Sequence, residues 1–342
     1  MNCSFLTNSL HIDLEGNVFP CTISRYANKG LLGSIKTESL EAIFLRSILH
    51  GSKCRSYCNK CTDAQYSFKD WKIESNNYDL LDLRLDNYCN FLCRTCSGYN
   101  SIAFKKESPE VKKRDISELI FKNIDFINRF SRIYISGGEP LLSRNTLKFL
   151  KLLSNNKQIM LSTNLSMNIP NEHTSELSRF ANATFFPSID GVGEVGKYIR
   201  YGFDEDKFFN NLNSLKKDYN IVPVITVNTL NILYLNPVIL KLSEYININN
   251  IYLNFLEDPI ELNITILPQY LKDLVFAKIK NIEGLLDPNF KIDAPYNLYK
   301  GIDLLKHMMR QDSGSKFNDI LDFLKEKDKI RNQSYKTIFP FL

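Results

Sequence analysis

From residue 80 onward, short apolar runs alternate with amphipathic segments, and this alternation restricts the fold more than any other feature of the chain. Strand-like runs occur at residues 80–85, 132–136, 159–162, 184–189, 222–227 and 251–255. Helical patterns lie between them, near residues 115–130, 145–153, 172–180, 204–215 and 237–245. Six strands separated by five helices predict an α/β fold, with a parallel sheet and helices on its outside. Active sites of such folds gather at the carboxyl ends of the strands.

The segments on either side of this pattern have a different character. The N-terminal part is rich in cysteine, and the part that follows Pro268 has the pattern of helices joined by loops. The 342 residues, 44% of them hydrophobic, are enough for one large domain with a small one attached. We therefore expect a small module at residues 1–70, a core domain at 78–262 and a helical C-terminal extension at 263–342.

All eight cysteines lie before residue 97. No apolar run has the length of a membrane span, and the first ten residues do not resemble a signal peptide, so we expect a cytoplasmic protein without a membrane partner. Cysteines in a reducing compartment are more often metal ligands than disulfide partners. The formal net charge of +5 is modest for this length, and we expect no nucleic-acid partner.

Cys89, Cys93 and Cys96 have the spacing C-x3-C-x2-C and directly follow the first strand of the alternating region. Three thiolates on one loop can hold a [4Fe–4S] cluster and leave one iron without a cysteine, which is the open position that a catalytic site needs. The alternative is a zinc site whose fourth ligand is His50 or another cysteine. In that case the chain would be a non-catalytic, zinc-binding interaction protein.

The other cysteines belong to the N-terminal module. Residues 10–14 and 18–19 flank a turn with Gly16, which predicts a β-hairpin, and a helix is expected at 38–50. A closed four-thiolate site, for zinc or for a second [4Fe–4S] cluster, is expected on Cys3, Cys21, Cys58 and Cys61. Cys54 is a spare thiol or an alternative ligand. Together with Cys58 and Cys61 it repeats the C-x3-C-x2-C spacing, but this second triad follows a helix and a loop, not a strand.

The segment Asp86–Cys96 resembles the signature loop of the radical S-adenosylmethionine (SAM) superfamily. The similarity continues at the ends of the next strands, each in the expected place. The second strand ends in Gly137-Gly138-Glu139-Pro140, the third in Thr163-Asn164 and the fourth in Ser188-Ile189-Asp190-Gly191, which Arg200 follows. The resemblance implies a partial (β/α)6 barrel of the TIM type with SAM at its open mouth.

This resemblance also implies a chemistry and a role for each motif. SAM would bind the open iron, and one electron would cleave it to methionine and a 5′-deoxyadenosyl radical that takes a hydrogen atom from the substrate. An external donor such as flavodoxin or ferredoxin would supply the electron. Gly137 and Gly138 would let the backbone approach a ligand, and Glu139 would contact the amino group of SAM. Hydrogen bonds from Asn164 and Ser188, and a contact of Arg200 with the SAM carboxylate, would complete the site. The alternative for Arg200 is a salt bridge on the protein surface.

The N-terminal module resembles the twitch domain, a half-size relative of the SPASM domain, which holds one auxiliary iron–sulfur cluster. Related proteins with such modules often modify peptides or proteins, and others act on small molecules such as sugars. We expect a peptide or protein substrate, with a small molecule as the alternative. The sequence assigns no acid, base or hydrogen donor near the substrate.

A glycine pattern after the fourth strand points to a different chemistry. Gly191, Gly193 and Gly196 match G-x-G-x-x-G, which is typical of dinucleotide-binding turns and would suggest a dehydrogenase. However, the match lies in the fourth strand unit, and residues 197–203 have no clear helical run. We therefore prefer the radical SAM hypothesis.

Overall fold

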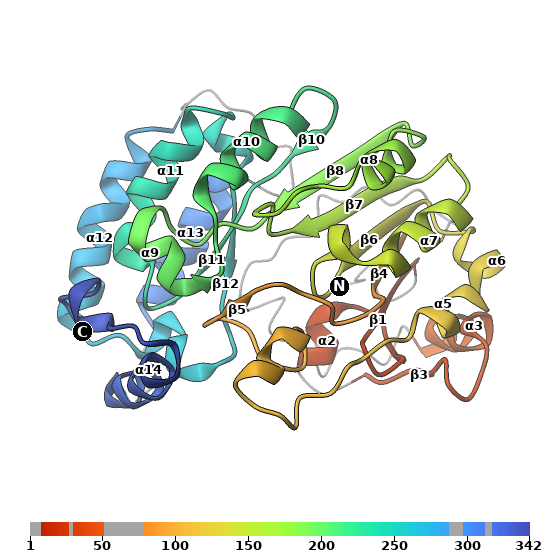
Figure 1. Cartoon of the computed structure of the whole chain (residues 1–342), viewed down its shortest axis with the longest axis horizontal. Coiled ribbons are helices and arrows are strands. Elements are labelled where there is room, and N and C mark those ends of the chain that lie inside the picture. The colour runs from red at the N-terminus through yellow and green to blue at the C-terminus, as the bar shows by residue number, and fades with distance from the viewer. Residues whose placement is uncertain (1–7, 27–29, 51–77, 287–296, 312–316) are drawn as a thin grey trace.

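The structure is a computed structural model of the whole chain, and it describes residues 8–26, 30–50, 78–286, 297–311 and 317–342 (Figure 1). Cys3, Cys54, Cys58 and Cys61 lie outside these ranges. The proposed four-thiolate site can therefore be followed only through Cys21.

Six parallel strands in chain order form the centre of the fold (Figure 1). They are β4 (Leu80–Arg84), β6 (Arg132–Ser136), β7 (Gln158–Thr163), β8 (Asn182–Pro187), β11 (Val224–Val227) and β12 (Tyr252–Phe255). A parallel bridge between Ser188 and Val224 connects the first four strands to the last two. A short strand, β10 (Asn220–Ile221), also pairs with β8. All six expected strands are present, so the prediction of a parallel α/β fold is confirmed.

The expected helices are also present between these strands. They are α5 (Ser117–Phe121), α6 (Ile124–Ile127), α7 (Arg144–Leu152), α8 (Asn171–Leu177), α10 (Glu205–Leu215) and α11 (Leu235–Ser243). Two of them begin at residues whose side chains accept hydrogen bonds from the first helical turn: Ser143 caps α7, and Asp204 caps α10. The single helix expected at residues 115–130 is instead two short helices, α5 and α6.

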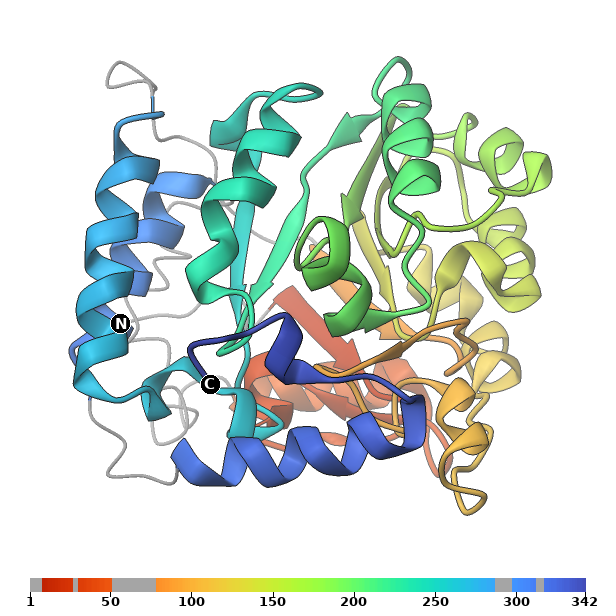
Figure 2. The same cartoon turned by 60° about the vertical axis from the view of Figure 1, so that its left-hand side comes forward.

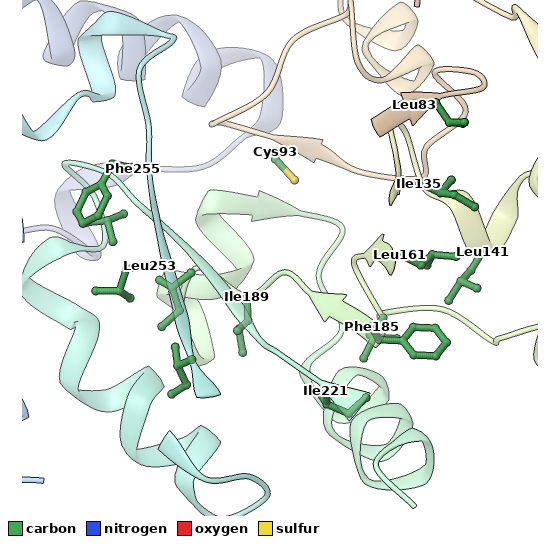
Figure 3. Close-up of a cluster of buried hydrophobic side chains, with 14 of the residues drawn as sticks. Leu83, Cys93, Ile135, Leu141, Leu161, Phe185, Ile189, Ile221, Leu253 and Phe255 are labelled. Carbon is green, nitrogen blue, oxygen red and sulfur yellow. The ribbon is translucent and has the colours of Figure 1, made fainter. Parts of the chain in front are cut away.

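The strands have one apolar and one polar face because side chains alternate along them. On β4 and β6, residues such as Leu83 and Ile135 are fully buried in the main hydrophobic core, part of which Figure 3 shows. Asp82 and Arg84 alternate with these leucines, and the register of the sheet places Asp82 beside Tyr134. The polar face is therefore directed away from the core and towards the inside of the partial barrel.

The N-terminal hairpin extends this sheet. Its strands are β1 (Ser9–Ile12) and β2 (Asn17–Phe19), and they pair antiparallel around Gly16, whose φ is 77°. This confirms the predicted hairpin. β1 also pairs parallel with β4, so the strand order is β10-β8-β7-β6-β4-β1-β2-β3, with β3 at Gly33–Ser34. Two helices, α2 (Thr22–Tyr26) and α3 (Leu40–His50), complete the described part of the module.

The C-terminal part is helical, as expected. It contains α12 (Gln269–Glu283), α13 (Leu298–Met309) and α14 (Phe317–Arg331). In Figure 2, α14 runs along the lower edge of the molecule, next to the segment that follows β4. Short 3-10 helices lie at Ile102–Lys106, Pro140–Leu142, Ile232–Tyr234, Ile248–Asn250, Ile260–Leu262, Ile264–Ile266 and Tyr335–Thr337.

A buried ion pair connects the hairpin to the core domain. Nδ1 of His11 on β1 lies 3.0 Å from Oδ2 of Asp82 on β4, and the hydroxyl of Thr22 donates a hydrogen bond to the same oxygen. Burial by itself would raise the pKa of Asp82, but the contacts with His11, Arg84 and Thr22 outweigh it, so the pKa is lower than usual. The Asp82 carboxyl group is therefore ionised down to a lower pH than usual.

We predict that Asp82→Asn lowers the free energy of unfolding of the metal-free protein by about 3 kcal/mol, because it breaks a buried pair. Since the folded pKa of Asp82 is depressed, its stabilisation is present above about pH 3.9 and is lost as the pH falls through the folded pKa. Urea unfolding at several pH values measures both effects. The control is Glu118→Gln, which removes an exposed pair with Lys148. Equal losses in the two variants would contradict the prediction.

Candidate active site

The first cysteine triad lies on the loop that follows β4. Cys93 belongs to β5 (Leu92–Cys93), which pairs antiparallel with β9 (Arg200–Tyr201) so that Cys93 is opposite Arg200. Cys93 is buried, Cys89 and Cys96 are partly buried, and none of the three is in a disulfide. Figure 3 shows Cys93 among the buried side chains of the main hydrophobic core. The structure therefore presents three thiols from one loop at the carboxyl edge of the sheet.

These thiols are in an environment that resists ionisation. Burial raises the pKa of Cys89 and of Cys93 to about 12 and also raises that of Cys96. For Cys89 and Cys93, the charges of neighbouring cysteines account for part of this rise, so the thiols lie within each other's electrostatic influence. Phe91 N donates a hydrogen bond to Cys89 Sγ over 3.4 Å, which stabilises a thiolate. Metal binding must displace the thiol protons, and the positive charge of iron provides the compensation.

The three thiols of Cys89, Cys93 and Cys96 fit a [4Fe–4S] cluster in which three of the four irons have a cysteine ligand. In the part of the chain that the structure describes, no three His, Cys, Asp or Glu side chains are arranged to hold a single metal ion. A four-iron cluster distributes its thiolate ligands over different irons, so it does not require convergence on one point.

Arg200 is the buried cation of this site. Its Nη1 donates to Oδ2 of Asp190 over 3.0 Å, and Oδ1 of Asp190 accepts a hydrogen bond from Thr226 N over 2.8 Å. Asp190 thus connects Arg200 to β11. Nε of Arg200 is buried and has no hydrogen-bond partner. A buried, unpaired N–H group is a position where an anionic ligand is stabilised.

The glycine pair after β6 packs against the start of the cysteine loop. Gly137 has a φ of 121°, and a Cβ on Gly138 would lie only 2.1 Å from the carbonyl oxygen of Tyr88. Gly138 N donates to Asp86 O over 3.3 Å, and Glu139 N donates to Tyr88 O over 2.6 Å. The close approach that we observe is therefore to the chain's own backbone, and it fixes the cysteine loop to β6.

Glu139 is almost fully buried, and three groups of the chain hold its carboxylate. Oε1 accepts hydrogen bonds from Leu141 N over 3.1 Å and from Thr163 Oγ1 over 2.8 Å, and Oε2 accepts one from Asn164 N over 2.6 Å. Burial raises its pKa to about 7, and these hydrogen bonds offset only part of the effect. Pro140 begins the 3-10 helix that follows and is buried. The result is a fixed carboxyl group whose charged form would be stabilised by a cation.

Two further expected site residues lie at the same edge of the sheet. Asn164 follows β7, and its Nδ2 donates to Oδ1 of Asn90 in the cysteine loop over 2.8 Å. Ser188 follows β8, and its N–H donates to Thr163 O over 2.8 Å. The structure thus brings the glycine pair, Glu139, Asn164, Ser188 and Arg200 to the edge that carries the cysteine loop.

Cys21 directly precedes α2 and is the neighbour of Thr22, the residue that bonds to Asp82. Its proposed co-ligands are outside the described residues.

Sequence reasoning missed two polar contributions. Asp86, inside the signature loop, accepts hydrogen bonds from Ser143 Oγ over 2.5 Å and from Asn145 Nδ2 over 2.8 Å, which joins the loop to the start of α7. Arg84 extends from β4 and donates to Asn100 Oδ1 over 2.7 Å. The charged residues of Leu81-Asp82-Leu83-Arg84, in alternation with leucines, were the available signal for a polar inner face.

The dinucleotide pattern has a different structural role. Residues 197–203, where no clear helical run was expected, are helical only as far as Ile199: α9 (Gly193–Ile199) begins within the glycine pattern and leads directly into β9. The N–H of Gly193 already donates to the carboxylate of Glu205 over 2.5 Å, and Gly196 packs against the backbone of Gly191. The glycines therefore allow the tight turn that places Arg200, and the geometry gives no support to a phosphate-binding site.

We predict that Glu139 makes the stability of the metal-free protein depend on pH. Between about pH 4.5 and 7 the folded state keeps a proton that the unfolded state has lost, so stability falls as the pH rises, by roughly 3 kcal/mol in total. Glu139→Gln should remove this decline. Denaturant unfolding from pH 4.5 to 7.5 measures it, and parallel curves for the two proteins would show that Glu139 does not titrate in this range.

No helix in the described ranges has the length and apolar character needed to cross a membrane.

Comparisons with known proteins agree with this geometry. No curated protein matches the chain. The family model described as the radical SAM superfamily matches residues 84–241, and the SPASM model, described as an iron–sulfur cluster-binding domain, matches residues 3–62. The first match contains the cysteine loop and all the strand-end motifs, and the second contains the five cysteines of the N-terminal module.

Several solved structures are similar in part. The structure of native anSMEcpe with bound AdoMet is 19% identical over 60% of this chain and 61% of that chain, with a TM-score of 0.45. The structure of Streptococcus suis SuiB bound to the precursor peptide SuiA is 12% identical over 72% and 53%, with a TM-score of 0.46. The structure of TYW1 with a lysine-pyruvate adduct bound is 15% identical over 71% and 87%, with a TM-score of 0.42. The matches to the first two span less than two thirds of those proteins.

The two family matches favour the enzymatic hypothesis over a zinc-binding interaction protein and over a dehydrogenase. They also identify the cofactors, because a radical SAM domain uses SAM with a [4Fe–4S] cluster and a SPASM domain binds auxiliary iron–sulfur clusters. The chain contains a radical SAM domain at residues 84–241 and an N-terminal iron–sulfur cluster-binding domain of the SPASM type at residues 3–62.

Proposed function

We propose that Cys89, Cys93 and Cys96 bind the [4Fe–4S] cluster that cleaves SAM, and that the enzyme takes a hydrogen atom from a peptide or protein. The observation that carries this proposal is the juxtaposition of three buried or partly buried thiols with Arg200 and Glu139 at one edge of the sheet. When bound, the cluster and SAM together supply the 5′-deoxyadenosyl radical. The residues of the chain bind and orient the cluster and SAM, and they exclude water from the site.

The charges of the site match the two ends of an amino acid. Glu139 holds a buried carboxyl group that would accept hydrogen bonds from the amino group of SAM, and Arg200 has an unpaired Nε–H that would donate to its carboxylate. Asn164 and Ser188 provide polar contacts from the next two strand ends. Gly137, Gly138 and Pro140 set the backbone that holds Glu139 in place.

We place the substrate against the inner face of the strands. This face carries Asp82 and Arg84 on β4, and a hydrogen bond of 2.5 Å joins the hydroxyls of Tyr134 and Ser162 on β6 and β7. Such a surface suits a substrate with many hydrogen-bonding groups, as a peptide has. The resemblance of the N-terminal module to the twitch and SPASM domains, which many peptide-modifying enzymes carry, is the second support.

The remaining assignments extend the same proposal. Residues 1–70 form the auxiliary module, 78–262 the core domain and 263–342 the extension. The auxiliary [4Fe–4S] cluster is bound by Cys3, Cys21, Cys58 and Cys61, with Cys54 as the alternative ligand. Flavodoxin or ferredoxin delivers the electron.

We predict that replacing Cys89, Cys93 and Cys96 together by alanine removes four irons per chain and abolishes 5′-deoxyadenosine formation, because the SAM-binding cluster has no other ligands. Iron analysis and electron paramagnetic resonance (EPR) of the reduced, anaerobically reconstituted protein measure the loss. Cys21→Ala is the matched control and should affect only the second cluster. Retention of full iron content and of the SAM-dependent spectrum in the triple variant would refute the assignment.

We predict that Glu139→Gln weakens SAM binding by about tenfold or more, because it removes the charge from a buried hydrogen-bonded carboxylate. Titration of the cluster-loaded protein with SAM measures Kd, with Glu118→Gln as the control on the exposed surface. An unchanged Kd would show that Glu139 does not hold the amino group.

The substrate class is tested by following the hydrogen atom that the 5′-deoxyadenosyl radical takes from the substrate. Short peptides encoded by neighbouring genes, made with deuterium on their carbon atoms, should transfer deuterium to 5′-deoxyadenosine. Mass spectrometry detects the transfer, and deuterated hexoses serve as the comparison. Transfer from a hexose but from none of the peptides would replace the peptide proposal by the small-molecule alternative.

A further inference from the structure

The cysteine loop contains a buried arginine that reaches to the other end of the chain. Arg94 lies between Cys93 and Cys96 and is only 2% exposed. Its Nη2 donates to Oδ1 of Asp328 over 2.6 Å and to Oε1 of Gln333 over 3.0 Å. Asp328 belongs to α14, so the partner of this loop residue comes from a position 234 residues further along the chain.

The same arginine is fixed from a second side by α9. Its guanidinium carbon lies 3.7 Å from the centre of the Tyr198 ring, and its Nε donates to Tyr198 O over 3.1 Å. The backbone N–H of Arg94 donates to Ile199 O over 2.7 Å. Arg94 is therefore held by its backbone, its guanidinium edge and its guanidinium face.

Asp328 is itself held by two further hydrogen bonds. Its Oδ1 also accepts a hydrogen bond from the Tyr198 hydroxyl over 2.7 Å, and its Oδ2 accepts one from Tyr335 N over 2.7 Å. One carboxylate thus joins the cysteine loop, α9 and the C-terminal tail.

A second buried ion pair repeats the connection one turn further along α14. Nε of Arg331 donates to Oε1 of Glu107 over 2.6 Å, and its Nη2 donates to Oε2 over 3.2 Å. Glu107 lies just beyond the 3-10 helix Ile102–Lys106 that follows the cysteine loop. The spacing of three residues places Asp328 and Arg331 on one face of α14, and that face contacts the loop at Arg94 and its continuation at Glu107.

We propose that Asp328 is a positioning residue of the cluster site: through Arg94 it holds the backbone between Cys93 and Cys96, so that the C-terminal helix completes the site. This inference rests on the proposed placement of the cluster on the cysteine loop. Cys93 and Cys96 can bind one rigid cluster only if the two residues between them keep one conformation. A buried charge pair fixes that conformation, because loss of either partner leaves the other charge buried and unpaired.

The test is Asp328→Asn in the cluster-loaded full-length enzyme. Asp322→Asn is the matched control, because Asp322 lies on the same helix in an exposed pair with Lys325. We expect Asp328→Asn to hold iron about tenfold less tightly against a chelator, as is typical when a partner behind a metal ligand is lost. We also expect its EPR spectrum with SAM to differ from that of the wild type, whereas Asp322→Asn should match the wild type in both measurements.

The readouts separate positioning from general stability. A purely structural role of Asp328 would lower the melting temperature of the metal-free protein and leave the iron affinity and the spectrum of the folded, loaded enzyme unchanged. That result would overturn the proposal. If Asp328→Asn does not fold, Tyr198→Phe tests the proposal by the same two measurements. This variant removes one hydrogen bond to Asp328 and keeps the aromatic ring under Arg94. Failure of the proposed function looks different, because then the wild type would show no SAM-dependent spectrum at all.

Discussion

The backbone contact between the glycine pair and the start of the cysteine loop is the constraint on which the rest of the site depends. Glu139 N donates to Tyr88 O, and Gly138 passes so close to Tyr88 that no side chain fits between them. This contact fixes the loop to the end of β6. It also places the carboxylate of Glu139 beside the end of β7. A shift of the loop would therefore move the thiols and the carboxylate together.

Around this fixed point, the site concentrates charges that are costly to bury. Cys89, Cys93, Glu139 and Asp190 all lie near the guanidinium of Arg200. In the metal-free protein burial keeps the thiols protonated and raises the pKa of Glu139, so most of the negative charge is suppressed. Loading with iron and a cationic amino group would allow these groups to ionise. The electrostatics of the site are thus suited to binding cationic groups in addition to Arg200.

Both ends of the described chain contribute to this arrangement. At one end, β1 pairs with β4, the strand that precedes the cysteine loop, and the His11–Asp82 pair joins the two strands. At the other end, α14 reaches Arg94 within the loop. The radical SAM core is therefore supported by segments outside the strand-helix repeat, and we attribute to them the rigidity that a cluster loop requires.

The sequence alone determined the parallel α/β architecture, since apolar periodicity depends only on neighbouring residues. It also located the cysteine triad and the strand-end motifs, because these are contiguous in the chain. It did not reveal that Asp328 pairs with Arg94 or that Asp190 pairs with Arg200, since nothing in local spacing shows which distant charges will be buried together. The split of the helix at 115–130 and the short helix at Gly193 were likewise decided by packing. Tertiary structure selected these partners because a buried charge is tolerated only where the fold brings an opposite charge to it.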